Sequence, residues 1–245
     1  MPLSAAYDDS EIFRLYQELP RNKIGLEAVS EWPLMKDMAQ GVEGQNVLDL
    51  GSGFGWFCKW ADENGARRVH GIDVSVNMLA KADEINSGGC ITYEQADLNT
   101  LVLPANSFDL VHSSLAFHHV ENLDRLIGQI QGSLKPGGRL VFSVNHPIRS
   151  AAHKASWQQT KDGEHFWPVS TYGQEGPRVL KWIADGIPSY HRTIQAYVSA
   201  VLKNGFELTD LAEYMKPPGS VPSSHYDNGK EIHRPIWLII SAKKK

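Results

Sequence analysis

The chain has 245 residues, and its 42% hydrophobic and 21% charged residues are typical of a globular protein with enough apolar surface for a full core. Its 24 basic and 28 acidic side chains give a net charge of -4, which excludes a general attraction for phosphate backbones or anionic lipid. We therefore expect neither nucleic acid nor a membrane as the partner.

The length fits a single domain spanning residues 1–245. Cys58 and Cys90 lie in unrelated segments without metal-ligand spacing, so we expect neither a disulfide framework nor a bound metal. No apolar run is long enough for a membrane helix, and the first residues lack the layout of a signal peptide. These features predict a cytoplasmic protein.

Two regions with different patterns make up the first 146 residues. Residues 1–40 are polar with scattered aromatic side chains, which predicts one or two helices that form a cover. In residues 41–146, β-branched or leucine-rich runs alternate with amphipathic stretches, as in parallel strands joined by crossover helices. The expected strands are VLDLG at 47–51, RVHGID at 68–73, CITYEQAD at 90–97, FDLVHSSL at 108–115 and GRLVFSV at 138–144. The expected helices span 56–64, 77–86 and 122–133.

The segment LKPGGRLVFSV should end a helix at the residue before Pro136, turn at Gly137 and Gly138, and continue as a buried strand. Residues 147–190 show little periodicity, which predicts an inserted lid with short strands at 166–172 and 178–183. Residues 191–245 then supply a helix at 192–203 and an antiparallel pair of strands at 206–214 and 234–242. The predicted fold is α/β: a doubly wound seven-stranded sheet, mostly parallel, with an antiparallel C-terminal strand.

The segment VLDLGSGFG leads a buried strand directly into a glycine-rich turn that opens a helix. Gly51, Gly53 and Gly55 permit positive φ and close approach of a ligand to backbone N–H groups. Asp73 ends the next strand, where a carboxylate can accept both hydroxyls of a ribose or cap the helix starting near Ser75. The order GxGxG, in place of GxGxxG, counts against a nicotinamide dinucleotide.

Asp49 lies in the strand before the glycines, where an unpaired carboxylate would be costly to bury, so it suits a ligand with an amino group, directly or through water.

Five motifs follow one another over residues 45–146: VLDLGSGFG, HGID, EQADL, FDLVHSSLAFHHV and LKPGGRLVFSV. Together they resemble the class I S-adenosylmethionine-dependent methyltransferases, in particular the small-molecule branch called type 11. More loosely, YHRT, GF and RPIWLIISA resemble one bacterial subgroup. The resemblance implies a Rossmann-like fold, S-adenosylmethionine as cofactor and a small-molecule acceptor.

The same resemblance implies a set of site residues. It assigns the cofactor to Gly51, Ser52, Gly53 and Gly55, its ribose to Asp73, its adenine to Val74, Met78, Asp97 and Leu98, and its methionine part to backbone near Ser113, Ser114 and Leu115. It also implies that the N-terminal cover closes over the cofactor with Tyr7, Arg21, Gly25, Leu26 and Trp32.

Histidine is the natural general base if the acceptor atom carries a proton. His146 is the preferred candidate, because it follows the last parallel strand at the edge where such sheets bind ligands. His118 and His119 follow the strand that meets the methionine part, and His119 could act as the base or only pack. His191 could orient an anionic acceptor or simply lie at a helix end.

The lid is rich in aromatic side chains, which could enclose an apolar acceptor, face the sulfonium or form the insertion's own core. They are Trp157, Phe166, Trp167, Tyr172 and Trp182.

Two alternatives to a methyltransferase stay open: an NAD(P)-dependent oxidoreductase, and a protein that binds S-adenosylmethionine without turnover. The acceptor atom, whether oxygen, nitrogen or carbon, and the choice between monomer and homodimer also stay open.

Overall fold

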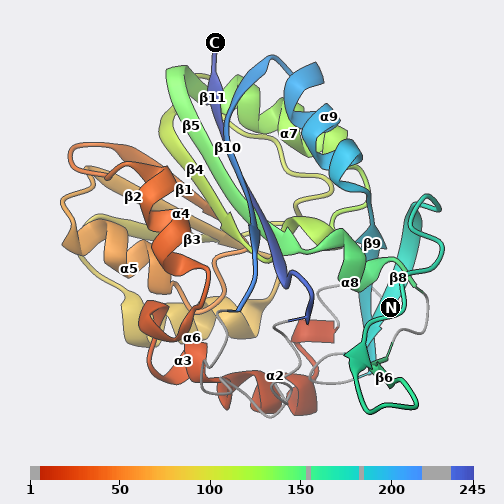
Figure 1. The fold of residues 1–245 in the computed structure, drawn as a ribbon. Helices are drawn as coiled ribbons and strands as arrows, with labels where there is room; N and C mark the ends of the chain where they lie inside the picture. The colour runs from red at the N-terminus through yellow and green to blue at the C-terminus, as the bar shows by residue number, and fades with distance from the viewer. Residues whose placement is uncertain (1–5, 153–155, 182–184, 217–232) are drawn as a thin grey trace.

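The computed structural model describes residues 6–152, 156–181, 185–216 and 233–245. Its centre is a seven-stranded sheet with the strand order β10-β11-β5-β4-β1-β2-β3 (Figure 1). The strands are β1 Asn46–Leu50, β2 Arg68–Asp73, β3 Ile91–Gln95, β4 Phe108–Ser114, β5 Leu134–Asn145, β10 Phe206–Tyr214 and β11 Trp237–Lys244. Strands β1 to β5 pair in parallel, and β11 runs antiparallel to both of its neighbours, which confirms the predicted fold class.

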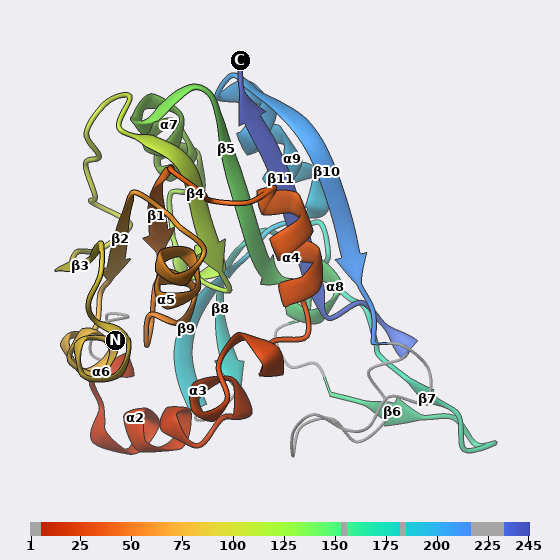
Figure 2. The same ribbon diagram turned by 90° about the vertical axis from the view of Figure 1, so that its left-hand side faces the viewer.

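Helices cover both faces of the sheet because its central strands are apolar on both sides. Leu48 and Leu50 of β1 pack with α7 (Leu123–Ser133) and α9 (Ile194–Lys203) on one face. Val47 packs with α4 (Trp32–Ala39) and α5 (Trp56–Glu63) on the other face. Figure 2 shows α4 and α5 in front of the sheet and α9 behind it. Helix α6 (Val76–Asn86) lies beside α5 and β3.

The N-terminal region differs from the prediction of one or two covering helices. It forms α2 (Ser10–Gln17), α3 (Pro20–Lys23), the 3-10 helix η1 (Leu26–Ala28) and α4. Gly25, at φ +84°, interrupts the helix after α3. Only the segments before α4 form a cover, because α4 buries Met35 against the sheet and so belongs to the core.

The boundary between α7 and β5 also corrects the sequence prediction. The helix ends at Ser133 and the strand begins at Leu134, so Pro136, Gly137 and Gly138 lie inside β5. The register between β4 and β5 shifts in this stretch, where Phe108 pairs with Leu134 and Leu110 with Arg139. Between these two pairs β4 has one residue and β5 has four, among them Gly137 with φ +75°, so the chain still turns at the glycines, but within the bounds of the strand.

The lid consists of α8 (Pro147–Ser150) and two antiparallel pairs of strands, β6 (Gln158–Gln159) with β7 (His165–Phe166) and β8 (Gly176–Lys181) with β9 (Asp185–His191). The strand predicted at 166–172 is wrong beyond its first residue, and β9 was not predicted. Side chains hold the stretch after β7, because Trp167 Nε1 donates to Ile148 O and Thr171 Oγ1 donates to Ala151 O. The strand predicted at 178–183 corresponds to β8, and its last two residues lie outside the described part.

The cover and the lid meet across the carboxyl edge of the parallel strands. Ile12 of α2 packs with Ile187 of β9, and Tyr7 and Tyr16 pack against this pair. Figure 2 shows α2 and α3 below the arrowheads of the parallel strands. Within the described residues, no helix combines the length and apolarity needed to cross a bilayer.

Candidate functional site

The glycine-rich turn between β1 and α5 has the backbone conformation that its sequence predicts. Gly51, Gly53 and Gly55 all have positive φ, at +77°, +52° and +74°. A Cβ added at Gly51 would overlap the Cβ of Ala116, so this position accepts glycine alone. The N–H groups of Gly51 and Ser52 donate to Ile72 O at 2.8 and 3.0 Å, which fixes the turn to the end of β2.

Asp73 lies opposite this turn at the end of β2. Its Oδ2 accepts from Gly53 N at 2.9 Å, and its Oδ1 accepts from Ser75 N at 3.0 Å. The carboxylate therefore holds the turn and the start of α6 together, and both oxygens keep lone pairs for a further donor. Desolvation raises the pKa of Asp73 above its usual range, although the two backbone donors act in the opposite direction.

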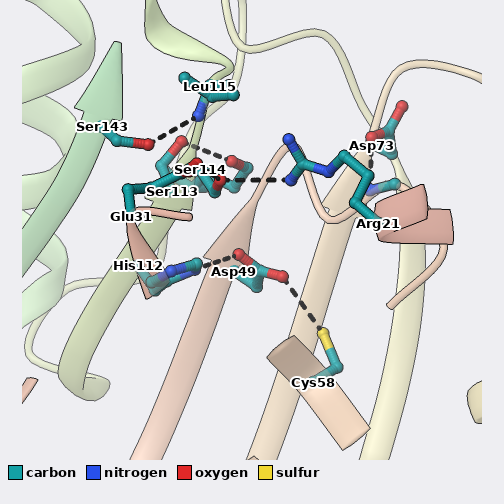
Figure 3. Close-up of polar contacts among 12 residues, drawn as sticks. Arg21, Glu31, Asp49, Cys58, Asp73, His112, Ser113, Ser114, Leu115 and Ser143 are labelled. Carbon is teal, nitrogen blue, oxygen red and sulfur yellow. Dashed lines mark hydrogen bonds and ion pairs between the residues drawn. The ribbon is translucent and has the colours of Figure 1, made fainter. Parts of the chain in front are cut away.

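The carboxyl end of β4 forms the other wall of this region (Figure 3). Ser114 Oγ accepts from Arg21 Nη2 at 3.3 Å and donates to Glu31 Oε1 at 3.4 Å, so two N-terminal segments reach the strand end. Leu115 has φ +57°, and its N–H donates to Ser143 O at 3.0 Å. Ser113 points away from the site and donates to Leu50 O at 2.7 Å.

Asp49 and His112 form a buried pair that the sequence analysis did not identify. Asp49 faces His112 in the register of β1 and β4, and His112 Nδ1 donates to Asp49 Oδ1 at 2.8 Å (Figure 3). Cys58 Sγ donates to Asp49 Oδ2 at 3.6 Å, and the His112 ring stacks on Phe57 with centroids 3.6 Å apart. The sequence did contain a sign of this pair, since Asp49 and His112 each interrupt an apolar strand.

His118 and His119 are the sequence-predicted histidines that reach the site. His119 Nδ1 donates to Pro188 O of β9 at 2.6 Å, so its Nε2 carries the lone pair and lies 3.4 Å from the Tyr7 hydroxyl. Burial lowers the pKa of His119 to about 4. Burial also lowers the pKa of His118, whose ring lies 4.3 Å from that of His119. Both rings are therefore neutral at neutral pH.

His146 and His191 are buried away from the site. His146 Nε2 donates to Glu213 of β10 at 2.8 Å, and its Nδ1 accepts from Ile148 N at the start of α8. Ser150 Oγ lies 2.8 Å from Nδ1 of His191, and the Tyr172 carbonyl lies 2.9 Å from Nε2. Both ring nitrogens of each residue are hydrogen-bonded within the fold, and neither histidine lines the cavity next to the glycine turn.

One cavity of about 800 Å³ lies between the cover, the strand ends and the lid. Of the thirteen residues that the sequence analysis assigns to the cofactor, Ser113 and Gly55 do not line it. The eleven that do are Asp49, Gly51, Ser52, Gly53, Asp73, Val74, Met78, Asp97, Leu98, Ser114 and Leu115. Gly55 does not line the cavity, and an added Cβ there would overlap the Tyr93 hydroxyl, so this glycine permits packing. Asn99 also lines the cavity and donates to Asp97 Oδ1 at 2.9 Å.

The cover and the lid contribute the rest of the lining. Of the expected gate residues, Tyr7, Arg21, Leu26 and Trp32 line the cavity, whereas Gly25 packs under Trp56. Of the lid aromatics, Trp157 and Trp167 line it, with ring centroids 5.2 Å apart. Phe166 is 40% exposed, Tyr172 OH accepts from Ile194 N, and Trp182 lies outside the described residues.

Comparison with known proteins gives consistent matches. Residues 48–142 match the family model described as a methyltransferase domain. The crystal structure of an S-adenosylmethionine-dependent methyltransferase from Mesorhizobium loti has 40% sequence identity and a TM-score of 0.84, over 90% of this chain and 100% of that chain. The chain belongs to the S-adenosylmethionine-dependent methyltransferases. It is thus similar over nearly its whole length to an enzyme of this family.

Two further relatives of this methyltransferase differ in how much of their length matches. A Haemophilus influenzae protein described as uncharacterized is 32% identical over 98% of this chain and 97% of its own length. A phosphoethanolamine N-methyltransferase of Triticum aestivum is 32% identical over 61% of this chain but 30% of its own length. The family membership identifies an enzyme that uses S-adenosylmethionine. It favours neither of the two alternatives, an NAD(P)-dependent oxidoreductase or a protein that binds S-adenosylmethionine without catalysis.

The residues of the cavity fit this cofactor. The turn at Gly51 leaves bare backbone at the wall, and the Asp73 carboxylate lies beside it. Three residues that line the cavity each have a buried polar atom without a hydrogen-bond partner among the described residues: Ser52 Oγ, Trp56 Nε1 and His112 Nε2. Buried polar atoms of this kind are normally satisfied, so they indicate a polar ligand at this end.

Proposed function

We propose that this methyltransferase transfers the methyl group of S-adenosylmethionine to a small-molecule acceptor whose reacting atom is oxygen, nitrogen or carbon. The observation that carries the proposal is a single cavity that joins the glycine turn and Asp73 to the aromatic and basic residues of the lid. The phosphoethanolamine N-methyltransferase among its relatives, named for a small acceptor, supports it.

The end of the cavity below β1 to β3 would hold the nucleoside. Asp73 has free lone pairs for the ribose hydroxyls, as expected for a strand-end carboxylate. Asp97 and Leu98 would contact the amino edge of adenine, while Val74 and Met78 would pack on its face. In these assignments the carboxylates accept hydrogen bonds from the ribose and the adenine, and the apolar side chains pack on the adenine ring.

The ends of β1 and β4 would hold the methionine part. Asp49 would accept from its amino group, directly or through water, and His112 would keep the carboxylate in place through the 2.8 Å hydrogen bond. The backbone at Ser114 and Leu115 would line the chain, and Arg21, next to Ser114, would bind its carboxylate.

Bound S-adenosylmethionine supplies an electrophilic methyl group. The protein aligns an acceptor with it in a cavity closed by the cover and the lid, and alignment alone accelerates such a displacement strongly. We propose His119, in place of His146 or His191, as the histidine that orients the acceptor. His119 lines the cavity, the bond to Pro188 O fixes its tautomer, and the acceptor would replace the Tyr7 hydroxyl that lies 3.4 Å from the Nε2 lone pair. A protonated acceptor would donate its hydrogen there.

Calorimetric titration with S-adenosylhomocysteine and with NAD(P) tests the cofactor assignment, and we expect binding of the first compound only. Incubation with labelled S-adenosylmethionine and a pool of metabolites should then give labelled small molecules. The Asp73→Ala variant serves as the control, since it should bind and turn over less. Binding without any labelled product, in a pool that gives products with a known methyltransferase, would contradict the proposal.

We further propose that the chain is one domain, since the contact of Ile12 with Ile187 joins the cover to the lid. The free thiols of Cys58 and Cys90 support a cytoplasmic location. Light scattering would decide between a monomer and a homodimer.

A further inference from the structure

The two ends of the cavity offer different surfaces to a ligand. The cofactor end is lined by the glycine turn and by Asp73. The lid end is lined by three tryptophans: Trp157, just before β6, Trp167, just after β7, and Trp237, the first residue of β11. Trp237 pairs with Asn145, the last residue of β5, so it lies where the lid begins. The fold thus gathers three large rings from separate segments around one part of the cavity.

Two of these tryptophans use their only polar side-chain atom inside the protein. Trp167 Nε1 donates to Ile148 O of α8 at 3.2 Å, and Trp237 Nε1 donates to Ser30 Oγ at 3.3 Å. A buried indole N–H normally finds such a partner, and the rest of the side chain is hydrocarbon. Trp167 and Trp237 therefore present ring surface to the cavity.

Arginine side chains hold the three rings without covering them. The Arg234 guanidinium lies 4.2 Å from the ring centroid of Trp167 and 5.2 Å from that of Trp157. The Arg149 guanidinium lies 5.4 Å from the ring centroid of Trp237. A cation stacks on one face of a ring and leaves the other face and the edges, and all three tryptophans stay partly exposed. An apolar ligand that covers this surface gains free energy by removing it from water.

The geometry favours an aromatic ligand over an aliphatic one. The planes of Trp157 and Trp167 make an angle of 72°, with ring centroids 5.2 Å apart. A ligand ring that lies parallel to one of them is nearly perpendicular to the other, and aromatic pairs prefer both the offset-stacked and the edge-to-face arrangement. Among the described lid residues that line the cavity, the aliphatic side chains are Ala152 and Val179, and Val179 is 68% exposed. An aliphatic chain would therefore find few aliphatic partners.

We propose that the acceptor carries an aromatic ring, which packs against Trp157, Trp167 and Trp237 while its reacting atom lies at the methyl group of S-adenosylmethionine. This inference rests on the proposed function and adds the chemical class of the substrate. Contacts that fix the ring also fix the direction from which its substituent approaches the methyl carbon, as alignment requires. The rings and the glycine turn lie at different ends of the cavity, so the acceptor and the cofactor do not compete.

Calorimetric titration tests the class of ligand. The protein is saturated with S-adenosylhomocysteine, which fills the cofactor end, and is titrated with 2-naphthol and with 2-decalol, its saturated counterpart. Both compounds share one carbon skeleton and one hydroxyl group, so burial of apolar surface alone does not favour 2-naphthol. We expect 2-naphthol to bind about fivefold more tightly or better, because contacts between rings add to burial. Equal or tighter binding of 2-decalol, or no binding of 2-naphthol, overturns the proposal.

Matched variants locate the binding. Trp157→Leu and Trp167→Leu stay apolar but lose the ring, so each should weaken 2-naphthol about threefold or more and change 2-decalol less. Trp157→Phe keeps a ring and should weaken 2-naphthol least. Phe166→Leu removes a 40% exposed ring of the same lid, on β7 and outside the cavity, and should change nothing.

The variants also separate this inference from the proposed function. Wild-type affinity for 2-naphthol in both Leu variants of the tryptophans overturns the proposal. Affinity for S-adenosylhomocysteine is measured throughout, since its loss would indicate failure of the cofactor site, and with it of the proposed function, instead.

Discussion

The two ends of the cavity are built by different means. The cofactor end depends on backbone: positive φ at Gly51, Gly53 and Leu115 shapes its walls, and the Asp73 carboxylate is fixed by two N–H groups. The lid end depends on long side chains such as Arg234, which stack on rings from other segments. A site built from backbone needs certain residue types at a fixed spacing. A site built from stacked side chains only has to fill its space, so its sequence can vary widely.

The largest effect should come from Gly51→Val, which breaks the backbone-built end. The left-handed φ costs a β-branched residue about 1–2 kcal/mol, and the overlap with Ala116 adds about 1–3 kcal/mol. We expect thermal unfolding at a clearly lower temperature and calorimetric affinity for S-adenosylhomocysteine that is at least about 100-fold weaker. Gly44→Val is the control: it has φ +69° and open space around it, so it should lose stability without losing affinity. Unchanged affinity in Gly51→Val would remove the turn from the site.

His119 lies where the two ends of the cavity meet, and it should make the free energy of unfolding depend on pH. Its pKa is lowered to about 4 in the folded protein, below the usual histidine value of about 6.5, so the unfolded chain takes up a proton first as the pH falls. The free energy of unfolding should therefore decrease between about pH 6.5 and pH 4, by about 3 kcal/mol from this residue. Urea titrations at several pH values measure it. His119→Gln should make the curve shallower, with the remaining slope due in part to His118, whereas His165→Gln, on β7 and outside the cavity, should leave it as steep as in the wild type.

Asp73→Ala tests the carboxylate of the cofactor end. It removes a charge-assisted acceptor, so the affinity for S-adenosylhomocysteine should fall by about 1–3 kcal/mol in calorimetry. Because the pKa of Asp73 is raised, the carboxylate takes up a proton at a higher pH than an ordinary aspartate. The wild-type affinity should accordingly weaken as the pH is lowered, and Asp73→Asn should remove this dependence. Asp210→Asn, an exposed residue of β10, is the matched control; an identical pH dependence in Asp73→Asn would contradict the assignment.

The sequence predicts the cofactor end because its determinants are local. The strands β1 to β4 follow from short apolar runs, and the turn at Gly51 and the strand-end position of Asp73 need no knowledge of distant contacts. His112 was missed for the opposite reason. Its partner Asp49 lies 63 residues earlier, and the pair forms only in the register of β1 against β4. Polar residues in neighbouring apolar strands would have been the signal to seek.

The local sequence pattern was not sufficient to predict the structure of the lid. His146 does follow β5 at the expected edge, but its ring turns to Glu213, which is 67 residues further along the chain. Pro188 lies inside β9 and makes its sequence look unlike a strand, yet β9 pairs with β8 as an antiparallel hairpin with one shift in register. Arg234 lies far in sequence from the tryptophans on which it stacks, so no window of sequence indicates this arrangement.

Arg178→Gln should affect the lid end of the cavity and leave the cofactor end unchanged. Of the substitutions considered, it should change the overall stability least. The substitution removes a guanidinium that donates to the carbonyls of Ala151, Gln174 and Pro177, and hydrogen bonds from a charged donor contribute about 1.5–3 kcal/mol. Because these carbonyls all belong to the lid, local opening of residues 147–191 should become easier while the sheet stays closed. Amide hydrogen exchange should accelerate roughly tenfold or more in the lid and remain unchanged in β1 to β5, with wild-type affinity for S-adenosylhomocysteine. Faster exchange across both regions would show that the lid and the cofactor end open together, and that the lid stabilises the sheet as well as the acceptor site.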